Sequence, residues 1–430
     1  MTSLDLRSPF ALLGRHRDLR LLLGAQVVSM AGDWILGIGL SYAVYHLTGS
    51  TLASALALLS GFVPMVVTGL VAGVFVDRWD RTRTMVATNL LLTLGLLPLL
   101  WVDGADTIWI VYVVMAVESV LEVFFAPAEQ ALLPRLVPEE DLVAANGLNA
   151  QARNVARLVG GALGGLVVAV GGLPALALID AATFVFAAVL VHRIATSGAS
   201  EPAPTVNAQA TVVVRGRFAS LADEWRAGFR ATWHQPAVRV LVVFTLITST
   251  GEGIMGTLFT PYVVDVLQGS STDLGLISGI QAVGGVAGGF LVVSVAHRWS
   301  PTRMLWAGSL VFGAVDLAIF LYPVVLVSVW PALIGMTLVG IPGAIVQTGL
   351  RTLLQRNTQD AERGRVFSLQ NLAMSVMLMA GATAAGFLGE AVGIMPILAL
   401  QGVAYLVAGL MVLASAPRLE PALDLAAARP

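Results

Sequence analysis

A small group of ionisable residues lies inside long apolar stretches of the 430-residue chain: Asp33, Glu118, Glu122, Arg153, Arg157, Asp180 and Glu252. Charged side chains are unfavourable in an apolar environment, and those that occur in membrane helices usually face a partner or line an ion or substrate pathway. Burial also favours the protonated, neutral form of a carboxyl group. These residues are therefore candidates for binding protons or charged ligands.

Two acids and two arginines share a regular spacing. Glu118 and Glu122 are four residues apart, as are Arg153 and Arg157, so each pair lies on one helical face. If the two stretches form an antiparallel hairpin, equal depth pairs Glu122 with Arg153 and Glu118 with Arg157. We expect an ion-pair ladder that keeps both carboxylates charged. The alternative is that substrate or proton binding opens the ladder and makes Glu118 or Glu122 part of the mechanism.

Asp33 and Glu252 have no obvious partner nearby in the sequence. We expect Asp33 to be the principal protonation site, with Glu252 as a second site or as a contact for a cationic substrate. The alternative for Asp33 is a helix-packing hydrogen bond to Ser29 or a neighbouring residue. Asp180 is expected to have a structural capping or hydrogen-bonding role near the outer face, and Asp316 is expected near the outer end of its helix.

The elements that position these residues are predicted to be membrane helices. Hydrophobic residues make up 57% of the chain and charged residues only 12%, whereas about a quarter of positions are charged in soluble domains. A spanning helix needs roughly 20 mostly apolar residues and satisfies its backbone polar groups internally. The expected fold class is an all-α polytopic membrane protein with twelve spans, near residues 20–46, 52–76, 84–102, 108–131, 145–171, 174–194, 237–265, 273–297, 303–321, 324–350, 365–389 and 395–415.

Arginine placement predicts the topology, because positively charged short loops stay in the cytoplasm. All 24 basic residues are arginines and alternate loops lack them, which puts both termini on the cytoplasmic side of a bacterial inner membrane. Residues 1–194 and 237–430 are predicted to form two six-helix bundles, joined by a cytoplasmic linker at 195–236. A solvated spacer is one interpretation of the linker. The other is an amphipathic helix, whose apolar face would hold Phe218, Leu221, Trp225 and Phe229.

A charged turn separates the second and third predicted helices. It contains, in order, Gly73, Asp77, Arg78, Arg81 and Arg83. A degenerate copy at residues 293–303 has His297 in place of the aspartate. Two six-helix halves repeated in the same orientation imply two bundles that rock around a site near the membrane midplane.

These features resemble the major facilitator superfamily over nearly the whole chain. The family's loop signature is met by the charged turn, except that Asp80 stands where a glycine is usual. Gly32-Asp33, the segment FFAPAEQALLPRLVPEEDLVAANGLN from Phe124 and the segment RGRVFSLQN from Arg363 resemble the drug and siderophore exporter branch, which includes macrolide-efflux proteins and the enterobactin exporter. Part of the family's antiporter signature is present in four glycines that permit close helix packing: Gly160, Gly161, Gly164 and Gly165. Ordinary tight packing, without bearing on the direction of transport, is the alternative interpretation of these glycines.

The resemblance implies a function and a gate. Asp77 would pair with arginines and with a neighbouring helix and so latch the inner face shut; alternatively, the charges of the turn only set the topology. The expected function is proton-coupled efflux of amphipathic small molecules by alternating access. Export of a siderophore or other native metabolite, or lipid flipping, is the alternative on the same scaffold. A membrane sensor or enzyme is less favoured.

Several kinds of partner are not expected. The net charge of −2 lacks the basic footprint of a nucleic-acid-binding protein. The chain has no cysteine, no lysine for a phosphate-binding loop and no evident convergence of histidines or acids at one membrane face. We therefore expect no catalytic residues, no metal and no cofactor. A monomer in the lipid bilayer is expected, with a small-molecule substrate and protons as its ligands.

Overall fold

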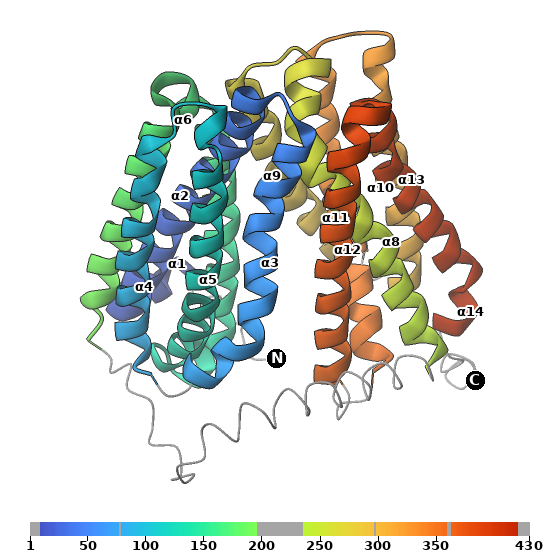
Figure 1. The fold of residues 1–430 in the computed structure, drawn as a ribbon. Helices are drawn as coiled ribbons and strands as arrows, with labels where there is room; N and C mark the ends of the chain where they lie inside the picture. The colour runs from blue at the N-terminus through green and yellow to red at the C-terminus, as the bar shows by residue number, and fades with distance from the viewer. Residues whose placement is uncertain (1–8, 77–78, 196–234, 296–297, 359–362, 420–430) are drawn as a thin grey trace, which may run out of the picture. The chain divides into compact units, whose positions relative to one another are not determined.

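The computed structural model describes residues 9–76, 79–195, 235–295, 298–358 and 363–419, which are almost entirely helical (Figure 1). The helices are α1 (Pro9–Arg15), α2 (Arg17–Thr48), α3 (Thr51–Val76), α4 (Arg81–Leu96), α5 (Trp109–Leu132), α6 (Leu142–His192), α8 (Pro236–Pro261), α9 (Ser271–Val295), α10 (Pro301–Leu321), α11 (Val329–Arg356), α12 (Arg363–Val392), α13 (Ile394–Ala414) and α14 (Ala416–Leu419). The π-helix η5 (Tyr262–Val266) continues α8. The described residues contain no β-strand, so the predicted all-α fold class is confirmed.

Eleven helices in the described ranges are long and apolar enough to cross a membrane. They overlap the predicted spans, but the two spans predicted at 145–171 and 174–194 run together as α6. Gly172 interrupts α6, since its φ of 62° and ψ of −158° are not helical. That φ lies in the region that favours glycine. The break therefore divides α6 into two helices at the place where a loop between two spans was predicted. The orientation of the termini stays a prediction.

The helices fall into two compact units. Unit 1 comprises Met1–Gly49, Leu56–Thr205 and Ser270–Gly279, and unit 2 comprises Ser50–Ala55, Val206–Gly269 and Ile280–Pro430. The start of α3 thus belongs to unit 2, and the start of α9 belongs to unit 1. The predicted bundle boundaries stay a prediction, and the predicted amphipathic helix of the linker lies outside the described residues.

Unit 1 is organised around α2 and α6. These two helices pack along much of their length, while α4 packs on both α5 and α6. A buried apolar cluster joins Leu22 of α2, Met85 of α4, Leu132 of α5 and Val191 of α6. This packing sets the relative positions of α2, α5 and α6, the helices that contain most of the predicted ionisable residues.

Unit 2 is organised around α8, α10 and α13. Helix α8 packs on α12 and α13, and α10 packs on α11 and α13. Large aromatic side chains fill the space between them. Tyr262 meets Phe320 edge to face, with ring centroids 5.6 Å apart, and both side chains are fully buried. Two of these helices, α8 and α10, carry the acids Glu252 and Asp316.

The helices that follow the charged turn and its copy begin with similar caps. Asp80 is the N-cap residue of α4, and its Oδ1 accepts a hydrogen bond of 2.8 Å from the backbone N–H of Arg83. Ser300 precedes α10 in the same way, and its Oγ accepts from the N–H of Arg303 at 3.2 Å. Such side-chain oxygens satisfy N–H groups that have no partner inside the helix. Asp80, which stands where a glycine is usual in the family's loop signature, therefore caps the start of α4.

Candidate functional site

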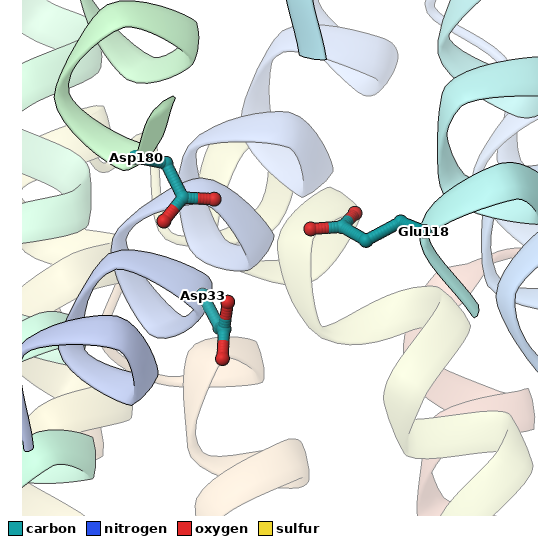
Figure 2. A group of neighbouring side chains, drawn as sticks. All are labelled: Asp33, Glu118 and Asp180. Carbon is teal, nitrogen blue, oxygen red and sulfur yellow. The ribbon is translucent and has the colours of Figure 1, made fainter. Parts of the chain in front are cut away.

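Three acids from three helices of unit 1 converge (Figure 2). Asp33 lies on α2, Glu118 on α5 and Asp180 on α6, and one carboxylate oxygen of each lies within 4.8 Å of the other two. Asp33 and Glu118 are half-buried, whereas Asp180 is 0% exposed. We call these three side chains the carboxylate cluster.

Gly32 determines how closely Asp180 approaches α2. A Cβ atom at residue 32 would lie 2.1 Å from Asp180 Oδ1 and 2.3 Å from Thr183 Oγ1, far inside van der Waals contact. The absence of a side chain therefore lets the Asp180 carboxylate lie against the α2 backbone, next to Asp33. Thr183 follows on α6 and donates a hydrogen bond of 2.9 Å to Asp180 Oδ1, which orients that carboxylate.

The cluster bears on the expectations for Asp180 and Asp33. Asp180 accepts a hydrogen bond, as predicted, and it also lies beside Asp33, which the sequence did not indicate. Asp33 Oδ1 is enclosed and has no hydrogen-bond partner among the described residues, so the alternative interpretation, a packing hydrogen bond to Ser29 or a neighbour, is not met at this atom. The convergence of these three acids is not evident from the sequence. Residues so far apart in sequence meet only through the packing of three helices.

The cluster concentrates negative charge in a small, largely enclosed volume. Carboxylates this close cannot all ionise without compensation, because like charges repel and burial disfavours the charged form. None of the three has an ion-pair partner in the part of the chain that the structure describes. Glu122, four residues after Glu118, is exposed and interacts electrostatically with Asp33. The arrangement is therefore suited to binding protons or a cation.

The two arginines of α6 do not pair as predicted. Arg153 lies 3.6 Å from Glu129, measured from Nη2 to Oε1. Arg157 lies over the ring of Trp34, with Cζ 5.1 Å from the ring centroid, and its predicted partner Glu118 is in the carboxylate cluster. The prediction assumed that the two helices pack as a hairpin. Instead, α5 packs on α4, and α6 packs on α2 and α4.

Arg153 belongs to a polar node around Glu129. Glu129 is 4% exposed, and its Oε1 accepts hydrogen bonds from Gln26 Nε2 at 2.7 Å and Asn149 Nδ2 at 3.4 Å. These contacts connect α2, α5 and α6. Glu129 and Gln26 are not among the residues predicted from the sequence. The signal that could have found Glu129 is its position two helical turns after Glu122, on the same face.

Replacing Glu129 with alanine should lower the free energy of unfolding by about 1–3 kcal/mol, because the buried Gln26 amide loses its acceptor. Thermal unfolding of the purified protein measures this change. Glu129→Gln is the matched control, since its amide oxygen still accepts hydrogen bonds and should preserve most of the stability. If the alanine variant were as stable as the wild type, the node would not hold the three helices together.

Unit 2 contains a second group of acids. The Tyr405 hydroxyl on α13 donates a hydrogen bond of 2.6 Å to Glu252 Oε1 on α8. The Tyr405 ring stacks on Phe312 of α10, with centroids 4.1 Å apart. Asp316, also on α10, is 2% exposed and interacts electrostatically with Glu252. Glu252 is thus held by a tyrosine that the sequence did not identify, and Asp316 belongs with it.

Only part of the predicted gating turn lies in the described residues. Asp77 and Arg78 lie outside them, while Gly73 falls within α3 and Arg81 and Arg83 fall in the first turn of α4. The predicted latch depends on Asp77 and stays a prediction.

The four glycines predicted for helix packing are buried on two sides of α6. A Cβ at Gly160 would lie 2.4 Å from the carbonyl oxygen of Ala31 on α2, and one at Gly164 would also meet α2 backbone. A Cβ at Gly165 would lie 1.9 Å from the carbonyl oxygen of Ser271 at the start of α9, and Gly161 faces the same helix. Helix α6 therefore approaches α2 and α9 more closely than larger residues would allow.

Sequence comparison shows which proteins this chain resembles. A family model described as a transmembrane secretion effector matches residues 7–429. The multidrug efflux pump Tap of Mycolicibacterium fortuitum is 27% identical over 393 residues, which cover 88% of this chain and 91% of that protein. Macrolide efflux protein A of Streptococcus pyogenes is 31% identical over 168 residues, or 39% and 42% of the two chains. The staphyloferrin A transporter of Staphylococcus aureus is 23% identical over 341 residues, or 79% and 81%.

Structural comparison supports the fold. A crystal structure of a mutant of the peptide transporter POT has a TM-score of 0.74 to this chain at 18% identity, covering 94% of this chain and 95% of that one. At this level of identity the likeness concerns the fold alone. It is the fold of a polytopic helical transporter.

Proposed function

Because the chain belongs to the major facilitator superfamily, in the family of transmembrane secretion effectors, and is similar to efflux pumps, we propose that it exports amphipathic small molecules in exchange for protons by alternating access. The single observation that supports proton coupling is the carboxylate cluster, whose acids have no ion-pair partner among the described residues. In this proposal α6 counts as two spans divided at Gly172, which gives twelve, and a monomer works in a bacterial inner membrane with both termini in the cytoplasm.

Asp33 is the principal protonation site in this mechanism. Its enclosed Oδ1 has no hydrogen-bond donor among the residues described, so a proton is free to occupy it. When Asp33 is ionised, the cluster attracts a cationic substrate, and when it is protonated that attraction weakens. Two ligands that compete for one negative charge lower each other's affinity by the same factor. Alternating access converts this competition into exchange.

Glu252 is the second site in the proposal. It is exposed, and Tyr405 fixes one of its carboxylate oxygens. A cationic cargo molecule could contact Glu252 while its apolar part lies on nearby aromatic rings. Glu252 would otherwise bind a second proton, as the counterpart of Asp33 in the other repeat.

Export of a siderophore or another native metabolite is the second candidate function. The similarity to the staphyloferrin A transporter favours it. The two candidates differ in the charge of their cargo, because an acidic site attracts cations and repels anionic chelators.

Uptake into inverted membrane vesicles tests the proposal. Lipophilic cations, macrolides and anionic chelators are supplied to vesicles energised with a pH gradient, with and without a protonophore. We expect protonophore-sensitive accumulation of the cationic compounds. Accumulation that a protonophore does not affect would contradict proton coupling, and accumulation of the anionic chelators alone would favour the second candidate.

A further inference from the structure

We propose that the carboxylate cluster of Asp33, Glu118 and Asp180 binds a divalent metal cation of the oxygen-preferring class, such as Ca²⁺ or Mn²⁺. This inference rests on the proposed function in one respect: the proposed function assigns the same carboxylates to proton binding. Metal and protons would then be competing ligands of one site.

The spacing of the oxygens fits such an ion. Each of the three oxygens lies within 4.8 Å of the other two. An equilateral triangle at that limit has its centre about 2.8 Å from each oxygen, and Ca²⁺ takes oxygen ligands at about 2.3–2.6 Å. Oxygens at that limit need to approach the centre by only a few tenths of an ångström to reach binding distance, which small side-chain rotations allow.

The cluster contains buried oxygens that lack a donor. Asp180 is 0% exposed, and its Oδ2 has no hydrogen-bond partner in the described part of the chain; the same holds for the enclosed Oδ1 of Asp33. Figure 2 shows the three carboxylates facing a common space between their helices. Buried polar atoms without partners are rare and unfavourable. A cation in that space would satisfy these oxygens.

The ligand set determines the class of metal. Three carboxylates without sulfur or imidazole favour Ca²⁺, Mn²⁺ and Mg²⁺ over Zn²⁺ or Cu²⁺. Up to three negative charges are available, so a divalent ion compensates more of them than Na⁺ does. Glu122 adds negative charge near Asp33. A basic residue also lies nearby, because the guanidinium of Arg157 lies over the ring of Trp34, the residue that follows Asp33.

The site is held in place by residues that are not ligands. Gly32 allows Asp180 to lie against α2, and Thr183 donates to Asp180 Oδ1. A Gly32→Ala substitution places a Cβ where the Asp180 carboxylate now lies. It therefore displaces one ligand without removing any charge, and so separates ligand geometry from simple electrostatic attraction.

Mn²⁺ binding to the purified full chain tests the site. It is measured as the loss of the electron paramagnetic resonance signal of free Mn²⁺ at mildly alkaline pH, where protons compete less with the metal for the carboxylates. We expect saturable binding to the wild type, with displacement by Ca²⁺. Asp180→Asn and Glu118→Gln should each weaken binding about tenfold or more, and Gly32→Ala roughly tenfold to a hundredfold, as for residues that orient metal ligands. Glu129→Gln, an acid of the same unit outside the cluster, is the control and should bind as the wild type does.

Thermal unfolding identifies variants that fail to fold. If Asp180→Asn is unstable, Glu118→Gln replaces it in the binding test, because Glu118 is only half-buried. The proposal is overturned if wild type shows no saturable Mn²⁺ binding, or if the cluster variants that fold bind it as well as Glu129→Gln does. Proton-driven export by metal-free proteoliposomes is measured in parallel. Export without Mn²⁺ binding would refute the metal site and preserve the proposed function. Mn²⁺ binding without export would preserve the metal site and refute the proposed function.

Discussion

Asp33→Asn should abolish export driven by a pH gradient while leaving the protein folded in the membrane. Asparagine has nearly the same size as aspartate but cannot bind and release a proton at its side chain. Asp33 Oδ1 has no hydrogen-bond partner among the described residues, so the substitution breaks no bond at that atom. The expected loss is therefore one of coupling and not of stability.

Substrate uptake into inverted vesicles measures the effect, and we expect Asp33→Asn to fall to the level of vesicles without the protein. Glu129→Gln is the matched control, because it also neutralises a largely buried acid of unit 1 but lies outside the carboxylate cluster. It should retain export. Gradient-driven uptake by Asp33→Asn at a rate close to that of the control would remove Asp33 from the mechanism.

Gly165→Ala should lower the free energy of unfolding by about 1–3 kcal/mol, as expected for overpacking, and should slow export. The added Cβ would lie 1.9 Å from the carbonyl oxygen of Ser271 and 3.0 Å from the backbone nitrogen of Gly275. Backbone atoms cannot rotate away as a side chain can. The start of α9 would therefore have to move away from α6.

Gly147→Ala provides the comparison on the same helix. A Cβ at this position meets nothing within 4 Å, and replacing glycine with alanine in a helix stabilises it by up to about 1 kcal/mol. Thermal unfolding should therefore rank Gly147→Ala at or above the wild type and Gly165→Ala below it. Similar stability of the two variants would show that the close approach of α6 and α9 is not required.

The helices could be predicted from the sequence because a spanning helix needs only a local apolar run. Two spans were predicted on either side of residues 172–173, and the structure has two helices that meet at Gly172. A Gly-Gly-Leu-Pro sequence at residues 171–174 is compatible with a loop, yet a single residue with positive φ suffices to break α6. A local sequence pattern does not distinguish a loop from so short a break.

The candidate site was predictable residue by residue but not as a group. An acid in an apolar run is visible locally, and this identified Asp33, Glu118 and Asp180. Their convergence depends on which helices pack together and on Gly32, whose importance appears only when Asp180 lies against it. The assumption of a hairpin between adjacent helices led to the wrong partners for Arg153 and Arg157.

Glu252 and Asp33 differ in their hydrogen-bond donors, although Asp316 in unit 2 also has a buried oxygen, Oδ2, without a partner among the described residues. Tyr405 donates a hydrogen bond to Glu252 in unit 2, and a donor of this kind stabilises an ionised carboxylate. In unit 1, Thr183 donates to one oxygen of Asp180, while Asp33 Oδ1 and Asp180 Oδ2 have no donor among the described residues. This difference is why we assign the exchange of protons to Asp33 and a secondary role to Glu252.

Simultaneous measurement of substrate and proton fluxes in proteoliposomes tests proton-coupled export most directly. The vesicles contain a pH-sensitive dye, a lipophilic cation is the substrate, and a pH gradient is imposed in either direction. Proton exchange predicts that substrate and protons move in opposite directions, that reversing the gradient reverses both fluxes, and that Asp33→Asn loses both. A substrate flux through the wild-type protein that does not depend on the pH gradient and is not accompanied by proton movement would contradict proton-coupled export.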